Sequence, residues 1–196
     1  MIEQLFTLIP FDAPHLPEIS LSGKLSLDDH FLNLRYSLAG ETESILLPPA
    51  SLVPSRKDEL WKATCFEFFL AIRDQPGYWE FNMSPSGDWN AYRMNAYRRV
   101  GFREETSIQQ VQFETREEVN TFVLNAVVDL NPIFQHGFDS DLLEIAITAI
   151  IQKKDGNETY WALTHPAPQA DFHRRESFIL ELAAQTHPSG QSVPGG

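Results

Sequence analysis

Apolar and polar residues alternate with a period of two along most of this chain, and no other feature restricts its possible folds as strongly. Successive side chains of a β-strand point to opposite faces, so this period places the apolar residues of a segment on one face. The alternation is clear at residues 32–38, 64–73, 78–84 and 122–130, and two later segments, 159–164 and 178–182, are short and typical of strands. Residues 142–151 are apolar almost throughout, which suits either a strand buried on both faces or a buried helix.

Short turn sequences separate these candidate strands. Asp74-Gln75-Pro76-Gly77, Pro85-Ser86-Gly87-Asp88 and Asp155-Gly156-Asn157 combine residues that favour tight turns. We therefore expect a meander of strands at 65–73, 78–84 and 89–95, and a hairpin that joins 142–153 to 158–164. Residues 46–60, which include three prolines, are predicted to form a loop. Regular short strands of this kind favour an all-β fold, an antiparallel β-sandwich.

The length of 196 residues is enough for one domain with a full core and short for two. No internal repeat or linker interrupts the first part of the chain, so residues 1–184 are predicted to form a single domain. Residues 185–196 contain two prolines, three glycines and too little apolar surface to become ordered. They are predicted to form a flexible C-terminal tail.

The net charge of −12, from 15 Lys and Arg against 27 Asp and Glu, makes nucleic acids and anionic membranes unfavourable default partners. The single cysteine, Cys65, excludes an internal disulfide and thiolate metal clusters. The first residues lack the pattern of a signal peptide, and no stretch reaches the roughly 20 apolar residues of a membrane helix. We therefore expect a soluble, cytoplasmic protein, whose protein partners the sequence leaves undetermined.

Sequence signatures of catalysis are absent. The chain has no glycine-rich phosphate loop, no G-x-S-x-G motif and no H-E-x-x-H motif, so we expect no catalytic residue and a protein that is not an enzyme. His165, Asp171 and His173 could hold a metal, but their spacing matches no common ligand pattern. The favoured alternative is that the two imidazoles bond carbonyl groups of the loop, and no metal site is predicted.

Arginine and aromatic residues alternate near residue 100. Arg98, Arg99 and Arg103 lie close to Tyr97 and Phe102. Such a segment could recognise a carboxylate, a phosphate or sugar hydroxyl groups. The favoured interpretation is that these arginines neutralise an acidic surface and stack on neighbouring rings.

A set of polar residues shares one face of the predicted meander. Glu67 lies between apolar residues, and the pleat places Glu80 and Asn82 together on the next strand, with Arg93 reaching them from the third. A carboxylate, an amide and a guanidinium suit the paired hydroxyl groups of a sugar. Two alternatives remain open: an exposed network of salt bridges, and a glycosidase that uses Glu67 and Glu80.

Three blocks of sequence carry a family resemblance. The first, Leu60 to Leu70, contains the pattern W-x-x-T-x-x-E-x-F, and the second, Tyr78 to Arg93, reads Y-W-E-F-N-M-S-P-S-G-D-W-N-A-Y-R. The third runs from Tyr160 to Leu182 and includes Asp171-Phe172-His173. Together they resemble the DOMON-like superfamily, in particular its family nine carbohydrate-binding modules and a bacterial DOMON-like subgroup.

This resemblance implies a β-sandwich module that binds a small sugar or the end of a glycan and catalyses no reaction. In the carbohydrate-binding branch, two tryptophans enclose a terminal sugar ring while Glu, Arg and amide side chains hold its hydroxyl groups. Carried over to the matching positions, this implies a ligand-binding site made of Trp61, Glu67, Arg93 and Trp161, with Asn82 as a further polar contact.

The resemblance also implies two cofactor alternatives to the expected absence of any cofactor. Family modules often bind calcium, for which Asp139-Ser140-Asp141 with Glu144 is a weak candidate. The haem-binding branch, with redox or sensing functions, uses an axial Met with His or Lys, and this chain contains Met83, Met94, His165 and His173. Met83 shares the predicted face of Trp79 and Phe81, which favours a core position. A Soret band in the purified protein would identify haem.

Overall fold

The computed structural model describes residues 2–12, 16–98, 101–134 and 142–182, and β-strands dominate this part of the chain. The first strands are β1 (Ile2–Pro10), β2 (Ile19–Asp28), β3 (Phe31–Gly40), β4 (Cys65–Ile72), β5 (Tyr78–Met83) and β6 (Trp89–Met94). They are followed by β7 (Arg103–Glu104), β8 (Gln112–Glu118), β9 (Thr121–Asp129), β10 (Leu143–Gln152), β11 (Glu158–Ala162) and β12 (Leu180–Glu181). Three short 3₁₀ turns complete the described elements: η1 (Thr42–Ser44), η2 (Leu60–Lys62) and η4 (Arg175–Ser177). Within the described ranges, no helical segment is long and apolar enough to cross a bilayer.

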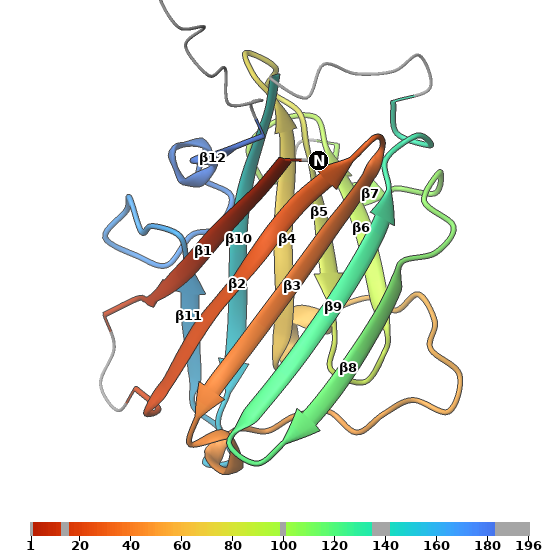
Figure 1. Cartoon of the computed structure of the whole chain (residues 1–196). Coiled ribbons are helices and arrows are strands. Elements are labelled where there is room, and N and C mark those ends of the chain that lie inside the picture. The colour runs from red at the N-terminus through yellow and green to blue at the C-terminus, as the bar shows by residue number, and fades with distance from the viewer. Residues whose placement is uncertain (1, 13–15, 99–100, 135–141, 183–196) are drawn as a thin grey trace, which may run out of the picture.

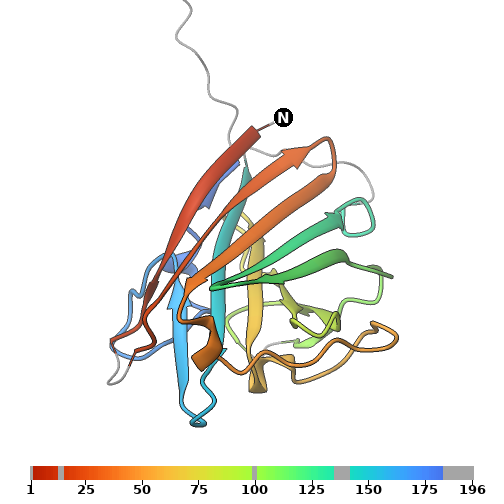
Figure 2. The same ribbon diagram turned by 60° about the horizontal axis from the view of Figure 1, so that its bottom comes forward.

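Two antiparallel sheets face each other and share one strand. The first has the order β1-β2-β3-β9-β8, and the second has the order β7-β6-β5-β4-β10-β11, with β12 paired to the start of β10. β1 belongs to both, because residues 2–8 pair with β2 while Ile9 and Pro10 pair with β11. The sheets are therefore joined along the side of β1 and β11 and diverge toward β8 and β6 (Figures 1 and 2). The expected all-β antiparallel sandwich is confirmed.

The main hydrophobic core lies between the two sheets, where alternate residues of the facing strands meet. From β4, β5 and β9 these residues are Phe66, Phe68, Leu70, Trp79, Phe81, Met83, Phe122, Leu124, Ala126 and Val128. The rings of Phe68 and Phe81 stack with their centroids 4.4 Å apart. These are the residues that the alternation assigned to a common face, so the face assignments of these segments are confirmed.

The second sheet is buried on its outer face as well. The segment that follows β11 covers this face, where a second apolar cluster includes Phe69, Tyr78, Tyr92 and Phe172. Because β10 is covered on both sides, its residues are apolar almost throughout. Residues 143–152 are a strand, so the alternative of a buried helix is wrong.

Asp88 anchors the long loop that precedes η2. Its carboxylate accepts hydrogen bonds from Ser51 Oγ (2.6 Å) and the Ser55 backbone N–H (3.1 Å), and it pairs with Lys57 Nζ at 2.7 Å. The loop predicted at residues 46–60 is confirmed for residues 46–59, which contain no helix or strand, whereas Leu60 begins η2. These bonds hold the loop against β6 and so fix the position of η2.

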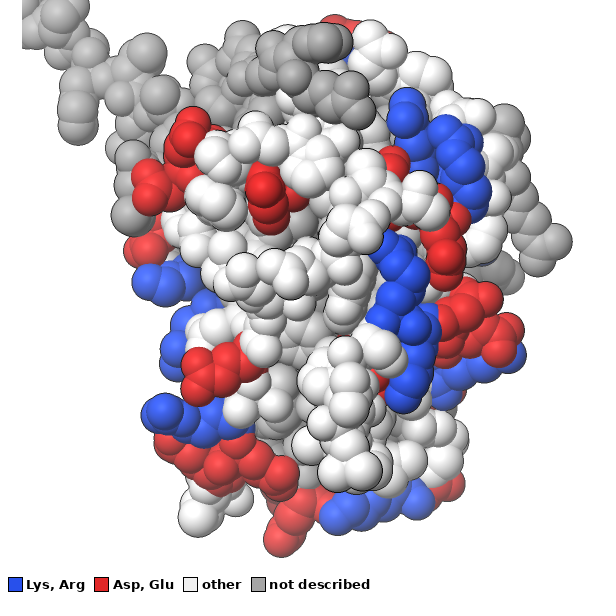
Figure 3. Space-filling model, turned by 90° about the vertical axis from the view of Figure 1, so that its right-hand side faces the viewer, with Lys and Arg blue, Asp and Glu red and all other residues white. Residues whose placement is uncertain are grey.

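The predicted meander is confirmed as β4, β5 and β6, whereas residues 178–182 form less strand than expected. A 3₁₀ turn, η4, leads into the two-residue strand β12 there. The predicted tail 185–196 and the acidic residues Asp139 and Asp141 lie outside the described residues. On the side drawn in Figure 3, acidic and basic side chains surround a largely uncharged centre, so this side carries no large patch of one sign.

Candidate functional site

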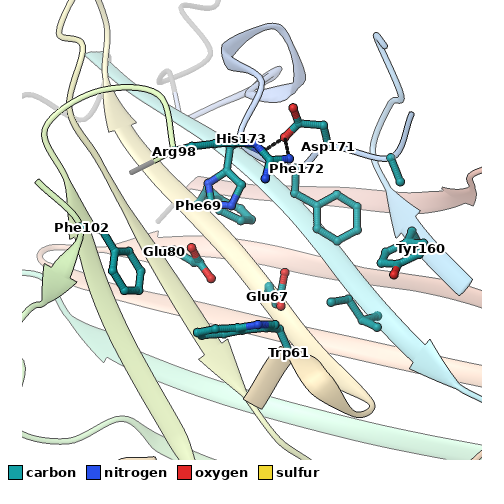
Figure 4. A pocket seen from close by; sticks show the side chains of 12 residues that line it. Trp61, Glu67, Phe69, Glu80, Arg98, Phe102, Tyr160, Asp171, Phe172 and His173 are labelled. Atoms are coloured by element: carbon teal, nitrogen blue, oxygen red, sulfur yellow. Dashed lines mark hydrogen bonds and ion pairs between the residues drawn. The ribbon is translucent and has the colours of Figure 1, made fainter. Parts of the chain in front are cut away.

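A cavity of about 720 Å³ lies on the outer face of the second sheet. Its floor comes from β4, β5, β10 and β11, which contribute Glu67, Phe69, Glu80, Ile150 and Tyr160. Its walls come from three separate segments, which contribute Trp61, Arg98, Phe102, Ala170, Asp171, Phe172 and His173. Figure 4 shows the two carboxylates on the floor between these walls. Strands therefore hold the polar floor and loops supply most of the surrounding side chains.

The floor is formed by neighbouring polar side chains of β4 and β5. Glu67 lies opposite Asn82, and Glu80 lies opposite Phe69, so the two glutamates are diagonal neighbours on one face of the sheet. Asn82 Nδ2 donates a hydrogen bond to Glu80 Oε1 (2.7 Å), and Thr148 Oγ1 donates one to Glu67 Oε2 (3.2 Å). Two buried acceptors, Glu67 Oε1 and Asn82 Oδ1, have no hydrogen-bond partner among the described residues.

Burial changes the acidity of both glutamates. Glu67 is 2% and Glu80 6% exposed. Burial raises the pKa of Glu80 to about 7, although the hydrogen bond from Asn82 acts in the opposite direction. Burial, together with the negative charge of Glu80, raises the pKa of Glu67 well above its usual value. Near neutral pH, therefore, Glu80 is present in both its protonated and its ionised form, and burial favours the protonated form of Glu67.

Aromatic side chains enclose the floor from two sides. Trp61, on η2, contacts the Tyr92 ring edge-on with centroids 5.6 Å apart, and Phe102 stacks on the same ring at 4.9 Å. Across the cavity, Phe172 packs against Tyr160 with centroids 6.1 Å apart (Figure 4). Such walls offer flat apolar surfaces to a ligand that reaches the carboxylates below.

Two loops meet above the cavity through charged and polar groups. Arg98 Nη2 pairs with Asp171 Oδ1 at 2.9 Å, and Tyr97 donates a hydrogen bond to the other Asp171 oxygen. His173 Nδ1 lies 2.9 Å from the Tyr78 hydroxyl. Burial, and then the positive charge of Arg98, lower the pKa of His173 to about 4, so this imidazole is neutral at pH 7.

The structure brings some of the five sequence-predicted residues to this cavity and not the others. Trp61 and Glu67 line it, and Asn82 lies on its floor beside both glutamates. Arg93 and Trp161 face the other side of the sheet. The Arg93 guanidinium lies 5.2 Å from the Trp79 ring, and Trp161 is 3% exposed in the main core. The expected placement of Arg93 and Trp161 beside Trp61 and Glu67 is therefore wrong.

The pleat gives the reason for these two corrections. In β6, Tyr92 lies opposite Glu80 and shares its face, so the adjacent Arg93 must point to the other face. In β11, Trp161 lies opposite Ala149, which belongs to the main core. Its indole N–H donates to Thr159 Oγ1 (3.0 Å), which satisfies the only polar atom of the ring inside the core.

Several lining residues were not assigned to a ligand site by sequence reasoning. The favoured interpretation assigned Arg98 to an acidic surface and gave Phe102 no ligand role, although the alternation of arginine and aromatic residues there was also compatible with recognition of sugar hydroxyl groups. Asp171 and His173 stood out as metal candidates, yet no group of three metal-ligating side chains occurs within the described residues. His165 lies elsewhere, with Nε2 2.9 Å from the carbonyl oxygen of Ile9 in β1. The expected bonds of both imidazoles to carbonyl groups of their own loop are therefore wrong, since His173 Nδ1 bonds the Tyr78 hydroxyl.

This fold is similar to that of a known protein, although the sequence matches none. No protein-family model matches the chain, and no curated protein matches it significantly in sequence. The crystal structure of a "putative carbohydrate-binding protein" from Bacteroides uniformis is similar, with a TM-score of 0.62 and 16% sequence identity over 90% of this chain and 84% of that one. The chain shares its fold with that protein.

Two further solved structures, both of a family nine carbohydrate-binding module from Caldicellulosiruptor kristjanssonii, are more distant. The complex with cellotriose has a TM-score of 0.48 and 11% identity over 84% of this chain and 74% of that one. The complex with glucose has a TM-score of 0.42 and 14% identity over 76% and 69%.

Proposed function

We propose that this protein is a non-catalytic carbohydrate-binding module, related to the DOMON-like superfamily, and that the cavity binds a small sugar or the end of a glycan. One observation carries the proposal. Glu67 Oε1 and Asn82 Oδ1 are buried acceptors without a hydrogen-bond partner in the part of the chain that the structure describes, at the floor of a cavity with aromatic walls. Leaving such atoms unsatisfied is costly, and ligand hydroxyl groups would satisfy them.

The shape and chemistry of the cavity support a sugar. Its volume of about 720 Å³ lies within the usual range of small-molecule sites, roughly 300–1,000 Å³. The C–H face of a pyranose packs well on an aromatic ring, and Trp61 and Phe172 present rings on two sides of the floor. The hydroxyl edge of the same sugar then points toward Glu67 and Asn82.

The test compares variants on the two faces of the sheet. In isothermal titration calorimetry against mono- and disaccharides chosen by a glycan array, Trp61→Ala and Glu67→Gln should abolish binding. Arg93→Gln serves as the matched control, since Arg93 is exposed on the other face and should bind sugar as the wild type does. Absence of binding to every sugar, or loss of binding in Arg93→Gln alone, would overturn the proposal.

The non-catalytic part of the proposal has its own test. A panel of aryl glycosides incubated with the wild type should release no phenol. Release that disappears in both Glu67→Gln and Glu80→Gln would instead identify a glycosidase, because such enzymes depend on a pair of carboxyl groups.

A further inference from the structure

The cavity contains two buried carboxyl groups, and no cation among the described residues is paired with them. Glu67 and Glu80 receive hydrogen bonds from neutral donors, Thr148 and Asn82, and neither forms an ion pair with a Lys or Arg of the described residues. Buried acidic side chains are normally paired with a cation or with strong donors. Without such a partner, burial favours the protonated form of both groups and raises their pKa values, and a cation in the cavity would favour the ionised forms.

The one arginine on the cavity wall is already engaged. Arg98 lies at the top of the cavity, where its guanidinium pairs with Asp171 and contacts the Tyr97 ring. The sheet separates Arg93, the next arginine toward the N-terminus, from the cavity. Among the residues that the structure describes, neither arginine lies against the two glutamates, and a cationic ligand would supply a positive charge there.

Glu67 points directly at the space where such a ligand would lie. Its Oε1 atom has no partner, and Figure 4 shows its carboxylate directed into the cavity next to Trp61. The faces of aromatic rings attract cations, so Trp61 and Phe102 on one side and Phe172 on the other add to the same preference. An ammonium group has three N–H donors and no acceptor, which complements a floor rich in acceptors.

On the basis of the proposed sugar-binding function, we infer that the ligand is an amino sugar whose free, protonated amine lies against Glu67 and Glu80. A neutral hexose would fill the same space but would leave the carboxylates without a cation. N-acetylation would remove the charge of the amine and two of its donors. A uronic acid would add a negative charge beside Glu67 and Glu80, which disfavours its binding.

The experiment measures affinities at pH 7 by calorimetry for matched sugars: glucosamine, galactosamine and mannosamine, their parent hexoses, their N-acetyl forms, and glucuronic acid. At least one free hexosamine should bind about tenfold or more tightly than its parent hexose and its N-acetyl form, a difference of about 1.4 kcal/mol. Glu80→Gln should reduce this preference. Arg93→Gln, on the other face, should keep the preference unchanged.

The outcomes separate this inference from the proposed function. Equal affinity for a hexosamine and its parent hexose overturns the amino-sugar inference and leaves sugar binding intact. Binding of no sugar in the panel overturns both. A Glu80→Gln protein that keeps the full preference for the hexosamine overturns the inference that the amine lies against both glutamates.

Discussion

Replacing Glu80 with Gln should change how the stability of the unliganded protein depends on pH. The pKa of the Glu80 carboxyl is about 7 in the folded protein, against an ordinary value of 4.5 that applies to the unfolded chain. One pKa unit corresponds to about 1.4 kcal/mol. Ionisation of this buried carboxyl therefore lowers the free energy of unfolding by about 3 kcal/mol once the pH is well above 7.

The direction of the effect follows from where the proton binds. Because the pKa is raised on folding, Glu80 contributes its full stability at low pH and loses it as the pH rises from about 4.5 through 7. His173 acts in the opposite direction, since its pKa falls from 6.5 to about 4 on folding and its contribution is lost as the pH falls through that window. The wild-type curve combines both effects, whereas the difference between Glu80→Gln and wild type removes that of His173 and reports Glu80 together with its effect on Glu67.

The assay is urea unfolding of both proteins at pH 5 and pH 8, followed by tryptophan fluorescence and circular dichroism. Between these two conditions the free energy of unfolding of Glu80→Gln should rise relative to that of wild type by about 2–3 kcal/mol. His173→Gln serves as a control with the opposite sign. A difference between Glu80→Gln and wild type that stays constant from pH 5 to pH 8 would refute the reasoning.

Two further predictions concern the positions of Trp161 in the main core and of Arg98 above the cavity. Trp161→Ala should lower the free energy of unfolding by about 3–5 kcal/mol and the melting temperature by many degrees in calorimetry, because Trp161 is in the main core; an unchanged melting temperature would contradict this placement. Arg98→Ala should weaken sugar binding while changing stability by less than about 1 kcal/mol, because its ion pair with Asp171 is half exposed. Unchanged affinity in that variant would show that the pair above the cavity does not contact the ligand.

The alternation of residue types was sufficient to predict the fold and the inward-facing residues of the central strands. Phe66, Phe68 and Leu70 lie in the main core, and Glu67 lies on the opposite face, as the period of two requires. The meander of β4, β5 and β6 could be predicted because the residues of its turns have strong local preferences for tight turns. The strand at 143–152 could not be distinguished from a helix, since a segment buried on both faces shows no alternation.

Which residues line the cavity was harder to predict from the sequence than the fold. Whether Arg93 shares the face of Glu80 depends on the register across the turn at residues 84–88, and a shift of one residue moves its side chain to the other face. Arg98 and Asp171 are 73 positions apart, and they meet only because two loops fold over the same sheet. Local preferences and spacing contain no information about such a contact.

β1 pairs with a strand of each sheet, and these two pairings cannot form at the same time during synthesis. β1 can pair with β2 as soon as residues 2–27 have been synthesised, but its pairing of Ile9 with Ala162 requires most of the chain. Contacts this distant in sequence form slowly because a long loop must close first. We expect the β4–β6 meander, which contains both glutamates, to form during synthesis before the sandwich closes. Until β11 arrives, the growing chain exposes the edge of β1 beyond residue 8, and a nascent chain halted there would be vulnerable to aggregation.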